Sequence, residues 1–227
     1  MVKTKYTKGR TTKMKRETGK HICVASGLLA AFVLWTLAVC VVDVQTIGPM
    51  ESAVGFAALN GWFHELTGVH MDLYVITDWL SLVPFLFVLG FGILGLVQWI
   101  TRKSLAKVDR SILILGGFYL VVMAMYLLFE VCVINFRPVL IEGVLEASYP
   151  SSTTMLVMCV MLTAKLQLRQ RIDRTKFRCL VTMVITVFTV FMVLSRLLSG
   201  VHWVTDIVGG MLLSAGLVWM YRAVSKI

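Results

Sequence analysis

The sequence predicts an all-α, polytopic membrane protein with six transmembrane helices. Hydrophobic residues make up 58% of the 227 residues and charged residues only 15%, a composition far too apolar for a soluble globular domain. Six long apolar runs occur along the chain, each near the roughly 20 residues that cross a bilayer as a helix. The basic residues gather in alternate connections between these runs, as they do in helical membrane proteins.

The N-terminal segment 1–20 is expected to be a solvated, basic cytoplasmic tail. It holds eight Lys and Arg against one Glu and shows no apolar periodicity. The run that follows, 22–42, is longer than the apolar core of a secretory signal, and residues 43–45 make a poor cleavage site. We therefore expect 22–42 to be the first transmembrane helix and 21–227 to form a single membrane domain.

The segment 44–78 differs from the rest of the chain because its apolar pieces are too short to span a membrane. Glycine and proline residues interrupt it repeatedly. A short helix over about 50–66 would suit the membrane interface, with Trp62 and Phe63 at the level of the lipid headgroups.

Five further apolar runs predict the remaining membrane helices. Prolines fall where helices tolerate them, with Pro84 in the first turn of the second helix and Pro150 directly before the fourth. An even number of spans places both termini on one side of the membrane. The predicted spans are 79–100, 112–135, 151–168, 179–198 and 202–221.

The distribution of Lys and Arg predicts the orientation in the membrane. Of the 22 basic residues, 20 fall in the tail, the 101–110 loop, the 165–178 loop and the C-terminus. The positive-inside rule makes this side cytoplasmic, and we expect the protein in the plasma membrane. The net charge of +10 is thus a signal of topology, and no nucleic-acid partner is indicated.

Two arginines, Arg137 and Arg196, lie on the opposite, outer side, where the other charged residues are acidic. Arg137 follows the third predicted helix and Arg196 ends the fifth. A bound anion is the simplest reason to keep them there, and the planar guanidinium fork suits phosphate oxygens.

His202 and Asp206 stand four residues apart, which puts them on one face of a helix. In such a pair the carboxylate holds the imidazole in one tautomer while the other ring nitrogen attacks a substrate. Ionisable residues inside an apolar run are candidates for function because they are costly there. The structural alternative is an aromatic and polar belt, with His202 and Trp203 at headgroup level.

A hydroxyl-rich stretch at 149–154, YPSSTT, opens the fourth predicted helix. The free backbone N–H groups and the dipole at a helix N-terminus form a ready anion site. Ordinary N-capping by Ser or Thr explains the same residues, and both interpretations stay open. This stretch, Arg137, Arg196 and His202 all fall at the same end of their helices, so one pocket can hold them.

No metal or disulfide framework is indicated by the cysteines and histidines. The five cysteines fall within apolar runs and form no C-x-x-C pair, so packing roles are expected. His64 and His70 have acidic neighbours, but their spacing is not that of metal ligands. We expect neither a metal nor another cofactor.

The motifs of this chain resemble those of the type 2 phosphatidic acid phosphatase (PAP2) and haloperoxidase superfamily. The pattern of that family is Lys, six residues, Arg-Pro; then Pro-Ser-Gly-His; then Ser-Arg, five residues, His, three residues, Asp. The third motif is complete here, from Ser195-Arg196 through His202 to Asp206. The resemblance covers about 130–206, together with the six-helix layout of the bacterial-type, integral-membrane lipid phosphatases.

The first two motifs match only in part. The first keeps Arg-Pro at 137–138 but has Glu130 at the lysine position. The second keeps Pro-Ser at 150–151 but has Ser152 and Thr153 at the glycine and histidine positions.

The resemblance implies a role for each matching residue. His202 would attack phosphorus to form a phosphohistidine, and Asp206 would orient its ring. The implied phosphate-binding residues are Arg137, Ser151, Ser152 and Arg196. Ser152 belongs to this set because the family's glycine contributes a main-chain N–H, which serine also has.

The two altered positions bear on activity. In the family the histidine at the position of Thr153 protonates the leaving group and then activates water, and a threonine cannot act as that acid near neutral pH. Glu130 lowers the positive charge of the pocket, unless it is protonated or serves as the substitute acid.

Two functions follow from these residues. The first is a membrane enzyme that hydrolyses a lipid phosphate or diphosphate, of the phosphatidate or polyprenyl diphosphate type, at the outer leaflet. The second is a catalytically weak or inactive relative that binds lipid phosphates or takes part in their transport. The intact His202–Asp206 pair favours the enzyme, whereas Thr153 and Glu130 favour the binder. The expected partners are a phosphorylated lipid and the bilayer, and the sequence leaves the oligomeric state open.

Overall fold

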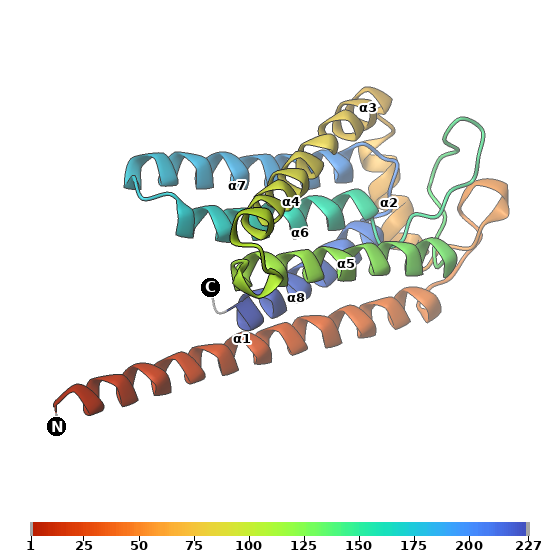
Figure 1. Ribbon diagram of the computed structural model, residues 1–227. Helices are drawn as coiled ribbons and strands as arrows, with labels where there is room; N and C mark the ends of the chain where they lie inside the picture. The colour runs from red at the N-terminus through yellow and green to blue at the C-terminus, as the bar shows by residue number, and fades with distance from the viewer. Residues whose placement is uncertain (1, 226–227) are drawn as a thin grey trace.

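The computed structural model describes residues 2–225, which fold into a bundle of helices (Figure 1). In chain order the helices are α1 (Val2–Val41), α2 (Ala57–Thr67), α3 (Met71–Leu80), α4 (Leu82–Arg102), α5 (Arg110–Val131), α6 (Ser152–Arg171), α7 (Thr175–Leu198) and α8 (Val204–Ser225). Two short 3-10 turns, η1 (Pro49–Glu51) and η2 (Leu105–Lys107), lie in the connections. Extended backbone in this range pairs only as isolated bridges. The predicted all-α class is confirmed.

Five helical segments within residues 2–225 are long and apolar enough to cross a membrane, which makes the chain an integral membrane protein, as predicted. They are α1 from Arg16 onward, α3 together with α4, α5, α7 and α8. Helix α6 (Ser152–Arg171) falls on the fourth predicted span, 151–168. Its 20 residues are long enough to cross a bilayer, but polar residues such as Lys165 and Gln167 reduce its hydropathy.

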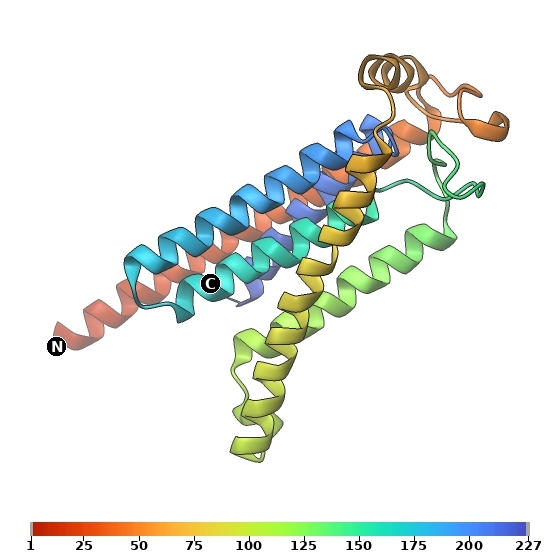
Figure 2. The ribbon, with the colours of Figure 1, turned by 90° about the horizontal axis from the view of Figure 1, so that it is seen from above.

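Helix α6 can carry polar residues because it lies at the centre of the bundle. It contacts α4, α5, α7 and α8, which surround it in both views (Figures 1 and 2). Thr163 and Gln167 are fully buried. The Thr163 hydroxyl donates to the Cys159 carbonyl at 2.7 Å, and the Gln167 amide donates to the Tyr221 hydroxyl. A helix enclosed by protein does not need an apolar face on every side.

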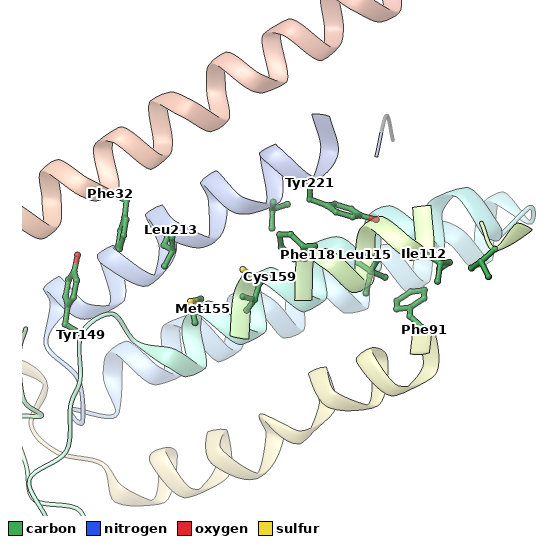
Figure 3. Close-up of a cluster of buried hydrophobic side chains, with 14 of the residues drawn as sticks. Phe32, Phe91, Ile112, Leu115, Phe118, Tyr149, Met155, Cys159, Leu213 and Tyr221 are labelled. Atoms are coloured by element: carbon green, nitrogen blue, oxygen red, sulfur yellow. The ribbon is translucent and has the colours of Figure 1, made fainter. Parts of the chain in front are cut away.

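A hydrophobic core joins α1, α5, α6 and α8 and fixes where α6 begins (Figure 3). The ring of Tyr149, two residues before Ser151, stacks on Phe32 of α1 at 6.4 Å, and its hydroxyl lies 2.7 Å from the Thr36 hydroxyl. A Cβ atom at Gly209 would come within 2.7 Å of the same ring. Glycine is therefore needed there for α8 to pack against the start of α6.

The N-terminal boundary differs from the prediction. Helix α1 begins at Val2, so the basic segment 1–20 continues the membrane helix, with Met1 outside the described residues. Lys and Arg are good helix formers, and a helix already nucleated in the membrane propagates into them without an apolar stripe.

The segment 44–78 also differs from the prediction. The expected helix over 50–66 is divided into η1 and α2, because Met50 and Glu51 have positive φ angles of 54° and 57°. The second membrane segment begins earlier than residue 79, since α3 continues into α4 with a break only at Ser81. The third ends at Val131 rather than 135, and an irregular loop follows from 132 to 151.

The two ends of the bundle are built differently. One end carries α2, α3 and the irregular loops 42–56 and 132–151, whereas the start of α1, the end of α8 and the connections α4–α5 and α6–α7 lie at the other (Figures 1 and 2). The predicted basic loops, 101–110 and 165–178, thus lie at the end opposite the predicted site. Which end faces the cytoplasm stays a prediction.

Candidate active site

The structure brings five of the predicted residues to one end of the bundle. Ser151 is the N-cap of α6, Arg196 lies in the last turn of α7, and Asp206 lies in the first turn of α8. His202 lies in the α7–α8 connection and Arg137 in the 132–151 loop. All five side chains are buried, with exposed fractions of 8% for Arg137 and 3% or less for the other four.

His202 faces Asp206, although α8 begins at Val204 and His202 therefore lies in the connection before the helix, not on the helical face that the four-residue spacing predicts. Nδ1 of His202 lies 3.6 Å from Oδ2 of Asp206, which is longer than a hydrogen bond. Neither ring nitrogen of His202 has a hydrogen-bond partner among the described residues. The ring is thus enclosed and aimed at its carboxylate, with the Ser148 backbone also beside it. Catalytic contacts of this kind often shorten only when substrate is bound.

Burial lowers the pKa of His202 well below its usual value of 6.5, and the positive charges of Arg137 and Arg196 lower it further. The ring is therefore neutral at pH 7. A neutral imidazole has the free lone pair that a nucleophile needs.

Asp206 is fully buried and fixed by its neighbours. Its Oδ2 accepts a hydrogen bond from the Trp203 backbone N–H at 3.0 Å, and its Oδ1 lies 3.4 Å from the amide nitrogen of Asn135. Its carbonyl accepts from the Ser151 backbone N–H at 3.1 Å, which ties the start of α8 to the start of α6.

Asn60 of α2 secures the first turn of α8 from outside. Its Oδ1 accepts from the Thr205 backbone N–H at 3.3 Å, and its Nδ2 donates to the Thr205 hydroxyl at 3.0 Å and the Gly55 carbonyl at 2.7 Å. On the other side, Nε1 of Trp35 donates to the Thr205 carbonyl at 3.1 Å. The residue directly before Asp206 is thereby held by two helices.

The α7–α8 connection that carries His202 is held by close backbone contacts. Gly200 has φ of 71°, and a Cβ atom there would come within 2.1 Å of the Gly68 carbonyl oxygen, so only glycine fits. The Ser199 carbonyl accepts from the His70 backbone N–H at 2.9 Å, and Nε1 of Trp203 donates to the Phe136 carbonyl at 2.7 Å.

Arg196 is held by α3. Its Nη1 donates to the Thr77 hydroxyl at 3.1 Å and to the Tyr74 carbonyl at 3.3 Å. Its Nη2 lies 3.8 Å from a carboxylate oxygen of Asp78, and its guanidinium carbon lies 4.6 Å from the centre of the Tyr74 ring. Its buried Nε has no partner among the described residues and remains a free donor.

Arg137 reaches the same aromatic ring from the 132–151 loop. Its guanidinium carbon is 5.9 Å from the centre of the Tyr74 ring. Its Nε lies 3.0 Å from a carboxylate oxygen of Glu146, an ion pair that lacks hydrogen-bond geometry. Its buried Nη1 has no partner within the described part of the chain. Each arginine therefore keeps an unused N–H donor.

At the start of α6 the structure shows the capping interpretation, and the anion site stays a prediction. The Ser151 hydroxyl accepts from the Thr154 backbone N–H at 3.4 Å, an N-capping contact. Ser152 and Thr153 instead line a cavity of about 340 Å³ between α4, α5 and α6. The rest of this cavity is mostly apolar, with Phe85 and Val88 from α4 and Leu156 and Val160 from α6 in its wall.

Glu130 is not brought into the cluster of buried arginines. It lies exposed near the end of α5, and its carboxylate makes no hydrogen bond or ion pair with the described residues. It lines a second, smaller cavity that shares Tyr126, Ser152 and Met155 with the larger one. It thus lies beside the polar end of the apolar cavity.

No cluster of three or more His, Cys, Asp or Glu side chains within residues 2–225 is placed to hold a metal ion. The ring of His64 packs against Trp203 at 5.5 Å, and Nε2 of His70 lies 2.9 Å from the Thr67 carbonyl. That the protein works without a metal or another cofactor stays a prediction.

Sequence reasoning missed the residues that support the site. They are Tyr74 and Thr77 of α3, Asn60 of α2 and Asn135 of the 132–151 loop. None of them belongs to a recognisable motif. The one available signal was polar side chains, Thr77 and Asp78, inside the apolar stretch that follows Met71.

Comparison with known proteins shows the family and the fold of the chain. The model of the PAP2 superfamily matches residues 52–227. The crystal structure of the first transmembrane PAP2 type phosphatidylglycerolphosphate phosphatase from Bacillus subtilis is similar, with a TM-score of 0.58 and 20% sequence identity over 89% of this chain and 94% of that chain. No curated protein matches the chain. The family match covers most of the chain, and the likeness to the solved structure is one of fold. The chain therefore belongs to the PAP2 superfamily and has the fold of a transmembrane PAP2 protein.

Proposed function

We propose that this protein is a membrane phosphatase that hydrolyses a lipid phosphate or diphosphate through a phosphohistidine on His202. The observation that carries the proposal is the buried His202–Asp206 pair beside two buried arginines, each with an unused N–H donor. A phosphoryl group has the charge and the oxygens to satisfy those donors. Membership of the PAP2 superfamily supports the same class of reaction.

The first chemical step uses the ring nitrogen that faces away from Asp206. Because Nδ1 is the nitrogen near the carboxylate, Nε2 forms the bond to phosphorus. The bond between phosphorus and the leaving oxygen breaks, and that oxygen keeps the electron pair. Asp206 stabilises the positive charge that develops on the ring, and Arg137 and Arg196 stabilise the charge on the phosphoryl oxygens. Water then attacks phosphorus, the bond to nitrogen breaks, and phosphate is released.

The apolar cavity supports a lipid substrate. It extends between α4, α5 and α6 from Ser152 and Thr153 down to Val160. A hydrocarbon chain would be buried there while its phosphorylated head remains at the polar end, beside the N-terminus of α6. By the positive-inside rule that end faces the outer leaflet of the plasma membrane.

The vacancy at Thr153 favours a diphosphate substrate. The leaving group of a phosphate monoester is an alkoxide, and a missing general acid typically costs about 10²–10⁴ in rate. The leaving group of a diphosphate is a phosphate monoester, which departs largely as an anion at neutral pH because its second pKa is near 6. Glu130, beside Ser152 in the smaller cavity, is the candidate for a substitute acid.

Phosphate release from a matched panel of lipid monophosphates and diphosphates tests this proposal. The purified full chain should cleave the diphosphates faster, and His202→Ala should abolish both activities. Thr153→His should raise monophosphate turnover by more than diphosphate turnover. If Glu130 is the acid, Glu130→Gln abolishes monophosphate turnover in the parent. Equal rates of release by the parent and His202→Ala would contradict the proposal.

The second candidate function is a lipid-phosphate binder, which Thr153 and the exposed Glu130 favour. In that case neither class of lipid is cleaved, and Thr153→His restores no activity. Arg137→Ala and Arg196→Ala would still weaken the binding of a phosphorylated lipid. Phosphate release above the His202→Ala background excludes this alternative.

A further inference from the structure

Tyr74 of α3 lies against both of the arginines in the site. The centre of its ring is 4.6 Å from the guanidinium carbon of Arg196 and 5.9 Å from that of Arg137. The two carbons are therefore no more than about 10.5 Å apart, the sum of those two distances. We propose that Tyr74 is a positioning residue that holds the two guanidinium groups together as one phosphate clamp, an inference that rests on the proposed function.

A clamp of this kind needs an attractive element that does not occupy the donors. Two buried positive charges repel one another before an anion binds. Asp78 and Glu146 reduce this repulsion, but a carboxylate competes with phosphate for the same N–H groups. An aromatic ring attracts a guanidinium through its face and leaves the in-plane N–H donors free. The unpartnered Nε of Arg196 and Nη1 of Arg137 fit this arrangement.

Helix α3 is fixed well enough to serve as the support. Thr77, one turn after Tyr74, is fully buried, and its hydroxyl accepts from Nη1 of Arg196 at 3.1 Å. The Tyr74 carbonyl accepts from the same nitrogen at 3.3 Å. The His70 backbone N–H, at the start of α3, donates to the Ser199 carbonyl at the end of α7. Helix α3, which carries Tyr74, is thus hydrogen-bonded to α7, which carries Arg196. This contact holds the ring of Tyr74 against Arg196.

The ring and the hydroxyl of Tyr74 can be separated by substitution. Tyr74→Leu removes the ring, whereas Tyr74→Phe keeps it and removes only the hydroxyl, which makes no hydrogen bond with the described residues. Trp79→Leu is a matched control on the same helix, because Trp79 is 71% exposed and makes no cation–π contact with either arginine. The probe is inorganic phosphate, whose binding to the purified full chain is measured by calorimetry and does not depend on turnover.

We expect Tyr74→Leu to weaken phosphate binding by roughly 3- to 30-fold, the range of one or two cation–π contacts. Tyr74→Phe should bind within about threefold of the parent, and Trp79→Leu should match it. The thermal unfolding midpoint of Tyr74→Leu should lie close to that of Trp79→Leu, because the role of Tyr74 is local to the two arginines. A general loss of structure would instead lower the midpoint of Tyr74→Leu. With a lipid substrate, Tyr74→Leu should raise KM more than it lowers kcat.

The outcomes separate this inference from the proposed function. If Arg137→Ala and Arg196→Ala lose phosphate binding but Tyr74→Leu does not, the positioning role is wrong and the phosphate site stands. If Tyr74→Phe weakens phosphate binding as much as Tyr74→Leu does, the hydroxyl acts instead of the ring, and the inference is also overturned. If neither arginine substitution affects binding, the proposed function itself fails.

Discussion

Asp206 is the residue on which the chemistry of His202 depends most directly. It is fully buried, and the Trp203 N–H and the Asn135 amide orient its two oxygens. An asparagine would fit the same space but present a different pattern of donors to the imidazole. The tautomer of the ring would then no longer be fixed with Nε2 free.

Asp206→Asn should therefore lower kcat by about 10²–10⁴ with little change in KM, since the effect falls on the nucleophile and not on phosphate binding. Steady-state phosphate release measures both parameters. The matched control is Asp72→Asn, an exposed carboxylate on α3. A kcat within threefold of the parent would mean that Asp206 has only a structural role.

Single residues of the site were predictable where their chemistry is unusual for their place in the chain. Arg137 and Arg196 stand out on a face that otherwise excludes basic residues, and the His202–Asp206 spacing is readable directly. Tyr74 and Asn60 were not predictable, because their roles consist of contacts with residues more than 60 positions away. Only the tertiary fold brings those partners together.

Among the helices, α8 depends on α2 for the position of its first turn. Asn60 is 1% exposed and makes three hydrogen bonds, two of them to Thr205 beside Asp206. Removing the amide leaves buried groups of Thr205 and Gly55 without partners, which typically costs about 1–3 kcal/mol per group.

Asn60→Leu should therefore lower the thermal unfolding midpoint and also reduce kcat, because the turn that carries Asp206 loses a support. Leu59→Ala, at an exposed neighbouring position on α2, should change neither. Thermal unfolding in detergent, followed by circular dichroism, checks the first part and phosphate release the second. An unchanged midpoint for Asn60→Leu would show that the α2–α8 contact contributes little.

The elements themselves were predicted where a long apolar run marks a helix facing lipid. The extension of α1 into its basic N-terminal part was missed, because that part lacks an apolar stripe. The prediction was wrong for 44–78, where positive φ angles at Met50 and Glu51 break the chain. The apolar run at 151–168 predicted α6. The helix is less apolar than the five other spans because it carries polar residues that are satisfied inside the bundle.

On the scale of the whole molecule, the charge distribution predicts the orientation of the bundle. The basic connections lie at the end opposite the candidate site. We therefore expect the end with the basic connections to face the cytoplasm and the end with the candidate site to face outward. We expect the Lys107→Cys variant to be labelled by a membrane-impermeant thiol reagent only after the membrane is opened. The Glu142→Cys variant should be labelled in intact cells. A background without the five native cysteines serves as the control. Labelling of the Lys107 position in intact cells would reverse the topology.

The central claim is that His202 carries the phosphoryl group during turnover. The most direct measurement is to mix the purified protein with a lipid diphosphate, quench in alkali, which preserves a phosphorus–nitrogen bond, and locate the added phosphate by mass spectrometry. We predict phosphate on the peptide that contains His202 in the parent protein and none on that peptide in His202→Ala. In Thr153→His the amount of bound phosphate should increase only if hydrolysis of the intermediate becomes slower than its formation. Turnover of the diphosphate by His202→Ala at the parent rate, with no phosphate on the His202 peptide of the parent, would contradict the account.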